Sequence, residues 1–194
     1  MNKIEIKRHL DPCGDMLDVF FIDDKPLYEY FNECSKNRDL DDLEISGLEI
    51  CWGADYDFEG DALFEKYILD KGTAITPILS CPDDLDFSCT VIVADVVYKD
   101  DVVCWKRIGL VDHSGENWDD EARCGILFTK KMTEEEFNAW YPQHWTEELF
   151  LRRVNYTYPY YQNENNIEWF ADCNFVFDQK QYDALVASRY PAKK

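Results

Sequence analysis

Two runs of β-branched and apolar residues constrain the fold of this chain more than any other feature of its sequence. The runs CTVIVADVVY (residues 89–98) and VVCWKRIGLV (residues 102–111) are separated only by Lys99, Asp100 and Asp101. β-branched residues suit the pleated, half-buried surface of a sheet, and a short polar break between two such runs is typical of a β-hairpin. The sequence therefore predicts a hairpin at the centre of a sheet.

Further strands and helices are predicted from the spacing of apolar residues along the rest of the chain. Residues 3–8 alternate as KIEIKR and residues 17–22 form a second apolar run, so these are predicted strands that can pair with each other. The remaining predicted elements are strands over residues 123–128 and 167–177, and helices after Pro26, between Asp61 and Asp70, from the Thr133–Glu136 capping box and after Asp178.

The order of these segments favours one fold class. Strands and helices are mixed without the βαβ alternation of a doubly wound sheet, so the sequence predicts an α+β fold: a mixed, mainly antiparallel sheet with a central hairpin and about four helices packed on it. No repeat or flexible linker divides residues 1–194, which we interpret as a single globular domain. Residues 155–163, NYTYPYYQN, are interpreted as a tyrosine-rich loop, either packed against the sheet or exposed as a contact surface.

The chain is strongly acidic, and its acidic residues are unevenly distributed. It contains 40 Asp and Glu residues against 20 Lys and Arg, a formal net charge of −20, and 23 of the acids but only 8 of the bases lie in residues 1–97. A field of that sign repels phosphate backbones and anionic lipid surfaces, and it steers cationic partners. We therefore expect a basic protein partner and neither nucleic acid nor membrane, although an acidic composition also serves solubility alone.

The sequence indicates a soluble protein of the bacterial cytoplasm. The N-terminal segment MNKIEIKRHLDPCGDM lacks the apolar stretch of a signal peptide, and no later segment approaches the roughly 20 apolar residues that span a bilayer. The cysteines are spaced irregularly along a long chain. We therefore interpret them as reduced thiols rather than as a disulfide framework.

Residues 55–66, DYDFEGDALFEK, match a calcium-binding loop in part. Asp55, Asp57 and Gly60 fit the pattern, but Lys66 stands at the twelfth position, where the loop requires a bidentate glutamate. We therefore interpret the segment as an acidic turn before a helix. The paired Cys and His spacings of zinc sites and the glycine-rich loops of nucleotide sites are missing, so we expect no metal and no cofactor.

No motif identifies an enzyme. The GxSxG pattern of a serine nucleophile is missing, and carboxylates are too numerous for a general acid–base pair to be recognised among them. His113, in the polar segment VDHSGENWDD, is the histidine to test for catalysis, and a solvated loop histidine is the simpler interpretation. Binding is therefore favoured over catalysis.

Two acidic segments are suited to binding a cationic partner. CPDDLDFSC (residues 81–89) precedes the first strand of the predicted hairpin, and ENWDDE (residues 116–121) follows the second. An aromatic ring flanked by carboxylates can hold Lys or Arg, because the ring adds cation–π attraction and the acids steer the approach. Each segment is also consistent with an ordinary polar loop. The candidate partner-binding residues are Asp83, Asp84, Asp86, Trp118, Asp119, Asp120 and Glu121.

The chain as a whole resembles the immunity proteins of bacterial polymorphic and contact-dependent toxin systems. The resemblance lies in an acidic chain with a β-rich middle and carboxylate-rich loops, and CPDDLDFSCTVIVADVVY and WKRIGL are its most family-like stretches. It implies a non-enzymatic inhibitor that binds a basic, nuclease-like toxin domain tightly and stoichiometrically. The alternative functions are a DNA mimic that inhibits a DNA-binding protein, and an enzyme whose carboxylate, His or Cys residues converge only in the fold.

Overall fold

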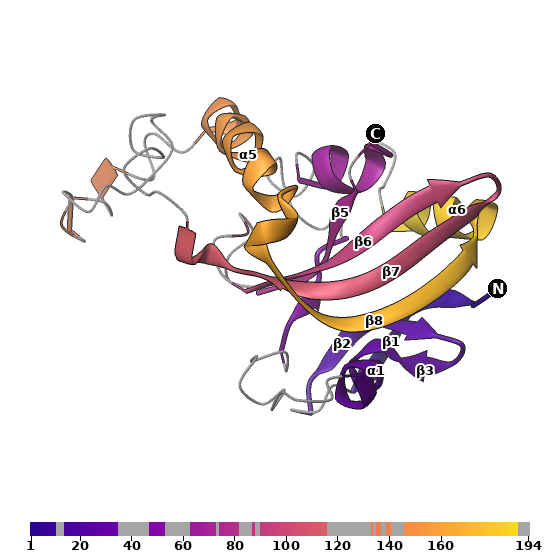
Figure 1. Ribbon diagram of the computed structural model, residues 1–194. Helices are drawn as coiled ribbons and strands as arrows, with labels where there is room; N and C mark the ends of the chain where they lie inside the picture. The colour runs from indigo at the N-terminus through magenta and orange to yellow at the C-terminus, as the bar shows by residue number, and fades with distance from the viewer. Residues whose placement is uncertain are drawn as a thin grey trace.

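The protein folds into two antiparallel sheets accompanied by helices (Figure 1). The predicted α+β class is confirmed, and the strands are divided between a 3-stranded and a 5-stranded sheet. The computed structural model describes residues 1–10, 14–34, 47–52, 63–72, 74–81, 87, 90–115, 133, 135–136, 139–140 and 146–189.

The predicted hairpin lies inside the larger sheet. The strands of this sheet, in order, are β4 (Glu49–Ile50), β5 (Ile75–Ser80), β6 (Val91–Lys99), β7 (Val102–Val111) and β8 (Ile167–Asp178). All neighbouring strands pair antiparallel, and β6 occupies the central position. Pro77 is accommodated in β5 at a shift of register between Pro77 and Leu79, because a proline cannot donate a hydrogen bond to a regular ladder.

The smaller sheet is formed by the N-terminal strands β1 (Ile4–Leu10), β2 (Met16–Ile22) and β3 (Lys25–Pro26). The predicted pairing of the first two strands is confirmed, in antiparallel register. The turn between β2 and β3 consists of Asp23 and Asp24, whose φ angles are 49° and 64°. Aspartate tolerates the left-handed region, and a two-residue turn of this kind follows the natural twist of paired strands.

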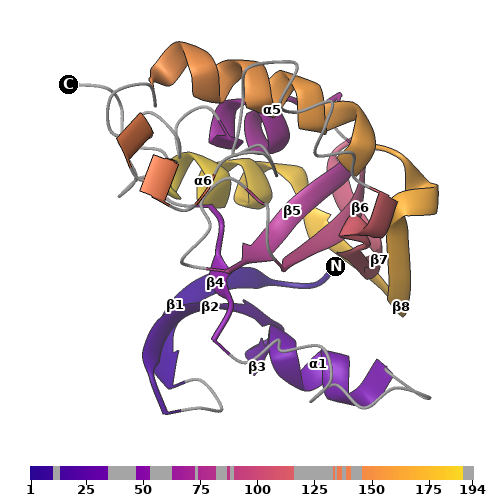
Figure 2. The same cartoon turned by 90° about the vertical axis from the view of Figure 1, so that its left-hand side faces the viewer.

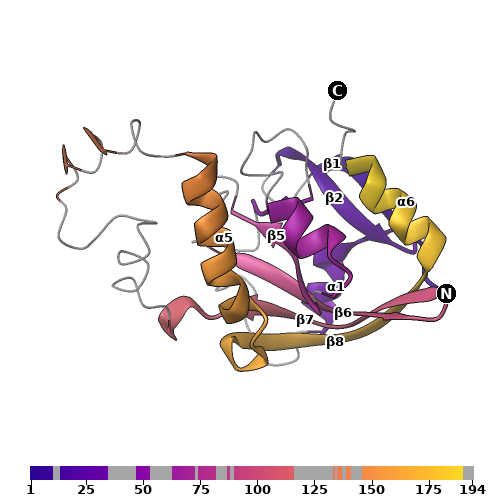
Figure 3. The ribbon, with the colours of Figure 1, turned by 90° about the horizontal axis from the view of Figure 1, so that it is seen from above.

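The longer helices of the described residues are α1 (Leu27–Cys34), the π-helix η2 (Phe64–Leu69), α5 (Glu147–Tyr161) and α6 (Gln179–Arg189). Figure 3 shows η2 between α5 and α6. The predicted helices after Pro26 and within residues 61–70 are confirmed by α1 and η2. Short 3-10 helices follow β7 and precede β8, at η3 (His113–Gly115) and η4 (Glu164–Asn166).

Helix α5 corrects the interpretation of residues 155–163 as a loop. The helix runs to Tyr161 and contains Pro159. Tyr161 and Val154 are buried, whereas Tyr158 and Tyr160 are half-buried. A proline and clustered tyrosines disfavour a helix, and burial of the helix face that carries Val154 and Tyr161 overrides this local preference.

Two of the predicted helix caps are present. Thr133 and Glu136 exchange hydrogen bonds at 2.8 and 3.2 Å, which is the reciprocal pattern of a capping box. Asp178 accepts the backbone N–H of Gln181 at 3.0 Å and caps α6.

The strand predicted over residues 123–128 lies outside the described residues. Within the part of the chain that is described, no helix combines the length and the apolar character needed to cross a membrane.

An aromatic core joins the two sheets. The ring of Trp105 in β7 packs edge-on against Phe20 of β2 at 5.7 Å and against Trp52 at 6.2 Å between centroids. The indole N–H of Trp105 donates to the hydroxyl of Tyr182 in α6 at 3.1 Å, and burial raises the pKa of Tyr182 well above its usual value. Large buried rings of this kind supply much of the apolar contact area of a core.

The N-terminus also ties the smaller sheet to β8. The backbone N–H of Asn2 donates to the carbonyl of Val176 at 2.6 Å, and the N–H of Val176 donates to the side-chain oxygen of Asn2 at 2.9 Å. The amide of Asn2 also donates to Asp23 at 2.6 Å. Figure 2 shows the resulting arrangement, with the smaller sheet and α1 at the bottom and α5, η2 and α6 above them.

Candidate partner-binding surface

The predicted partner-binding residues are Asp83, Asp84, Asp86, Trp118, Asp119, Asp120 and Glu121, and all of them lie outside the described residues. Their nearest described neighbours define where the two acidic segments join the fold. These neighbours come from the ends of β5, β6 and β7.

The first acidic segment is anchored at both of its ends and at Phe87. The N–H of Cys81 donates to the carbonyl of Thr90 at 3.1 Å, which extends the pairing of β5 with β6 by one step. Phe87 is only 3% exposed, although it directly follows the carboxylate of Asp86 in the sequence. The described residues Cys81, Phe87 and Thr90 are therefore held by the fold.

The second acidic segment follows η3, which is held at the end of β7. The carboxylate of Asp112 accepts the N–H of Ser114 at 2.9 Å, and this hydrogen bond holds the pKa of Asp112 below its usual value. The hydroxyl of Tyr160 donates to the carbonyl of Asp112. The turn that ends at Gly115, one residue before the acidic segment, is therefore attached to α5.

Tyr161 joins the bases of the two segments. Its hydroxyl donates a 2.6 Å hydrogen bond to the carbonyl of Phe87. Its ring packs edge-on against Phe87 at 6.2 Å and against His113 at 6.0 Å between centroids. One buried side chain at the end of α5 therefore contacts an anchor residue of each acidic segment.

A third acidic segment precedes η2 in the sequence, and Tyr67 of η2 contacts the same buried residues. Tyr67 of η2 packs against Phe87 at 5.6 Å, Tyr161 at 5.9 Å and Tyr158 at 5.2 Å. Residues 55–62, the acidic part of the calcium-like segment, lie outside the described residues and run directly into η2. Lys66 stands at the position where a calcium-binding loop requires glutamate. Its ammonium group lies 4.3 Å from the centre of the Tyr158 ring. We call Tyr67, Phe87, His113, Tyr158 and Tyr161 the tyrosine cluster.

The strand pairing explains why these anchor residues meet. β5 ends and β6 begins at the paired residues Ser80 and Val91, and β7 ends at Val111, which pairs with Ile167 at the start of β8. These residues mark one end of the antiparallel sheet. The connections that carry the two predicted binding segments therefore leave the sheet from the same end, opposite the turn between β6 and β7.

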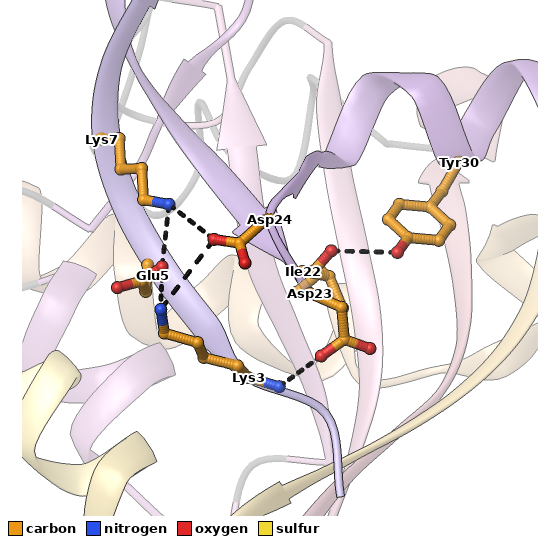
Figure 4. Close-up of polar contacts among 7 residues, drawn as sticks. All are labelled: Lys3, Glu5, Lys7, Ile22, Asp23, Asp24 and Tyr30. Carbon is orange, nitrogen blue, oxygen red and sulfur yellow. Dashed lines mark hydrogen bonds and ion pairs between the residues drawn. The ribbon is translucent and has the colours of Figure 1, made fainter.

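Many cations of the described residues are engaged within the fold. Arg189 bonds Asp18 at 2.8 Å and the carbonyl of Trp52 at 2.7 Å, and Lys25 lies 2.5 Å from Glu33. The close-up in Figure 4 shows a further network, in which Lys3 and Lys7 flank one carboxylate oxygen of Glu5 and reach the carboxylate of Asp24. Because these cations are paired within the fold, the excess charge that remains at the surface is negative.

No described arrangement indicates metal binding. Among the residues that the structure describes, no three His, Cys, Asp or Glu side chains gather in a way that would hold a metal ion. His113 lies in η3 and is half-buried beside Tyr161, rather than in a fully solvated loop. None of the described cysteines forms a disulfide with another described residue, and burial raises the pKa of the Cys51 thiol.

The tyrosine cluster was not predicted from the sequence as a unit. The sequence predicts that Tyr67 belongs to the apolar stripe of a helix and that Tyr161 belongs to a loop. Phe87 stands out among the carboxylates of CPDDLDFSC as an aromatic residue, and this was the available signal that the segment is anchored. The convergence of these residues depends on strand order, which no local pattern specifies.

Comparisons with protein-family models, with curated proteins and with solved structures found no match to this chain.

Proposed function

We propose that the protein is a non-enzymatic acidic binding protein of the immunity type, which neutralises a basic, nuclease-like toxin domain by direct contact. This proposal rests on one observation. Described residues that lie near three acidic segments in the sequence meet in the tyrosine cluster. In the sequence, Asp86 directly precedes Phe87, Glu116 lies three residues after His113, and Asp61 lies six residues before Tyr67. Described residues that lie near three acidic segments in the sequence thus contact one another.

Electrostatics supports a cationic partner. The chain carries a formal net charge of −20, and cations such as Arg189, Lys25 and Lys66 are held by carboxylates, carbonyls or rings of the fold itself. An excess of carboxylates on a protein attracts a basic surface and accelerates its approach. The binding should therefore be fast at low ionic strength and weaker as salt rises.

The tyrosine cluster supports slow release of the bound partner. Phe87 and Tyr161 are almost fully buried, and Tyr67 is 1% exposed, so the base of the acidic segments is packed rather than solvated. A preorganised binding surface loses less conformational entropy when a partner docks. Inhibition by simple coverage of the toxin follows from such binding and requires no catalytic group on this chain.

The direct test is capture of a partner from a lysate of cells that express the neighbouring genes, with the purified protein as bait at low and high salt. The proposal predicts one basic, nuclease-like domain at near-equal stoichiometry, retained at low salt and reduced at high salt. Loss of the nuclease activity in the purified complex would complete the assignment. Capture of several unrelated DNA-binding proteins would favour DNA mimicry instead, and no capture at either salt concentration would contradict binding as the function.

A further inference from the structure

Strand β1 lies at an edge of the smaller sheet. Among the described strands only β2 pairs with it, in a regular antiparallel register from Ile4 to Leu10. An edge strand presents a row of backbone N–H and C=O groups on its outer side, and such a row is a template for a further strand. The outer side of β1 is therefore suited to strand addition.

Two hydrogen bonds identify the residues of β1 that direct their backbone groups outward. The N–H of Asp23 donates to the carbonyl of Lys3 at 2.9 Å, so the backbone of Lys3 faces β2. The N–H of Asn2 donates instead to the carbonyl of Val176 in β8. Successive residues of an antiparallel strand alternate between its two sides. The residues of β1 whose N–H and C=O groups point outward are therefore Ile4, Ile6, Arg8 and Leu10.

The side chains on one face of β1 form a row of alternating charge. Lys3, Glu5 and Lys7 share this face (Figure 4), because side chains two residues apart in a strand point the same way. The side chains of Glu5 and Lys7 are 32% and 39% exposed. Lysine on an edge strand ordinarily discourages pairing, since like charges would meet. A glutamate between two lysines instead allows opposite charges to meet when two copies of the strand pair antiparallel.

We propose that two copies of this chain associate through β1, with the strands antiparallel and Ile6 of one copy opposite Ile6 of the other. In this register, Glu5 of each copy lies opposite Lys7 of the other. The outward backbone groups of Ile4 in each copy meet those of Arg8 in the other, so backbone bonding and charge favour the same register. The inference goes beyond the proposed function and does not depend on it.

The neighbouring registers are less favourable. Centring the pair on Glu5 would place Glu5 opposite Glu5 and Lys3 opposite Lys7. Centring it on Lys7 would place two Lys7 side chains opposite each other, and like charges directly opposite destabilise a sheet. Centring it on Ile4 would require the outward backbone groups of Asn2, whose N–H already donates to β8.

The predicted association is weak and depends on concentration. A contact between two short strands buries less area than a standard protein interface. Each copy also carries a formal net charge of −20, which opposes the approach of a second copy. We therefore expect a monomer at about 1 μM and a substantial fraction of dimer at about 200 μM.

The first experiment tests the register by charge reversal. Sedimentation equilibrium at about 0.15 M salt, which screens long-range repulsion, gives the dimer dissociation constant of each variant. Glu5→Lys and Lys7→Glu each place like charges opposite one another twice, so each should raise this constant by about tenfold. An equimolar mixture of the two variants restores opposite charges at every position, and it should form a mixed dimer about as tightly as the wild type associates. Urea unfolding of each variant checks that the fold is kept, since exposed ion pairs contribute little to it.

The second experiment tests the backbone contact. Arg8→Pro removes an outward N–H that takes no part in the pairing with β2, and a proline is tolerated at such a position of an edge strand. It should raise the dimer dissociation constant by about tenfold or more. Arg8→Ala is the matched control: it removes the same charge, on a side chain that is 64% exposed, but keeps the N–H. It should associate as the wild type does.

Three results would overturn the proposal. The first is a wild type that remains monomeric at about 200 μM. The second is a dimer that Arg8→Pro and the charge reversals leave unchanged, or a mixture of Glu5→Lys and Lys7→Glu that stays monomeric. The third is a monomeric wild type whose capture of a basic domain is weakened by Arg8→Pro but not by Arg8→Ala, because the edge would then receive a strand of that domain instead of a second copy.

Discussion

The guanidinium of Arg107 lies across the ring of Trp169 and bonds the carboxylate of Asp95 at 2.9 Å. Its terminal nitrogen also bonds Glu164 at 2.6 Å, so that β6, β7, β8 and the start of η4 are joined through one side chain. The Asp95 side chain is only 12% exposed, whereas that of Glu164 is 66% exposed. The main contribution of Arg107 to stability is therefore that it neutralises the nearly buried carboxylate of Asp95.

Replacement of Arg107 by methionine should lower the free energy of unfolding by about 2 kcal/mol, because the nearly buried carboxylate of Asp95 would lose its ionic partner. Asp95→Asn combined with Arg107→Met should recover part of this loss. Urea unfolding of the two single variants and the double variant gives the coupling energy between the residues. If the changes in unfolding free energy of the two single variants add up to that of the double variant, the two residues are not coupled.

Gly109→Ala should destabilise the protein by roughly 1–3 kcal/mol, since β7 and β8 approach too closely there for a side chain. A β-carbon at Gly109 would lie 2.5 Å from a methyl group of Ile167 and 2.9 Å from the backbone oxygen of Glu168. Gly115→Ala is the control, because the nearest atom to its β-carbon would be the Tyr160 hydroxyl, at 3.1 Å, rather than backbone. Thermal unfolding of both variants checks the prediction, and equal effects would contradict it.

Acid should weaken the attachment of the β2–β3 turn to the N-terminus. The backbone N–H of Lys3 and the amide of Asn2 hold the pKa of Asp23 below its usual value of 3.8. Lys7 and Lys3 likewise hold the pKa of Glu5 below 4.5. These depressed values contribute stability that is fully present above the unfolded-state pKa and is lost as pH falls through the folded-state pKa.

The contribution of these two groups to the free energy of unfolding should therefore be level above about pH 5 and should fall at lower pH, from below 4.5 for Glu5 and below 3.8 for Asp23. Asp23→Asn keeps an oxygen acceptor for Lys3 but cannot titrate, so its stability should fall less steeply in acid. Chemical unfolding at a series of pH values measures both slopes. Identical slopes for the variant and the wild type would remove Asp23 from the explanation.

Much of the fold was predictable because its signals are local. The alternation in KIEIKR, the runs flanking Asp100 and Asp101, and the Asp178 cap each specify an element without reference to distant residues. Helix α5 was missed because Pro159 and its neighbouring tyrosines disfavour a helix locally, and the burial of Tyr161 is a tertiary effect. The way in which the two sheets are joined likewise depends on contacts between residues far apart in the sequence, such as that between Asn2 and Val176.

The candidate surface was predictable only in part, for the same reason. Charge identified the acidic segments that contain Asp83 and Asp119, since composition can be counted along the chain. The tyrosine cluster could not be predicted from the sequence. Tyr67, Phe87 and Tyr161 come from three separate parts of the chain, and the order of the strands brings them together. The left-handed conformation of Phe87 has no sequence signal, because phenylalanine is not a residue that favours it.

The association rate of the captured basic domain, measured by stopped flow over a range of salt concentrations, tests the proposed function most directly. Asp83→Lys with Asp84→Lys, and separately Asp119→Lys with Asp120→Lys, should each slow association by about tenfold at low salt and flatten its salt dependence. Glu29→Lys with Asp101→Lys is the control: it makes the same change in net charge on exposed residues of α1 and the β6–β7 turn. We expect the control to associate at nearly the wild-type rate. Equal slowing by all three double variants would show that net charge alone drives association, and it would contradict a binding surface at the tyrosine cluster.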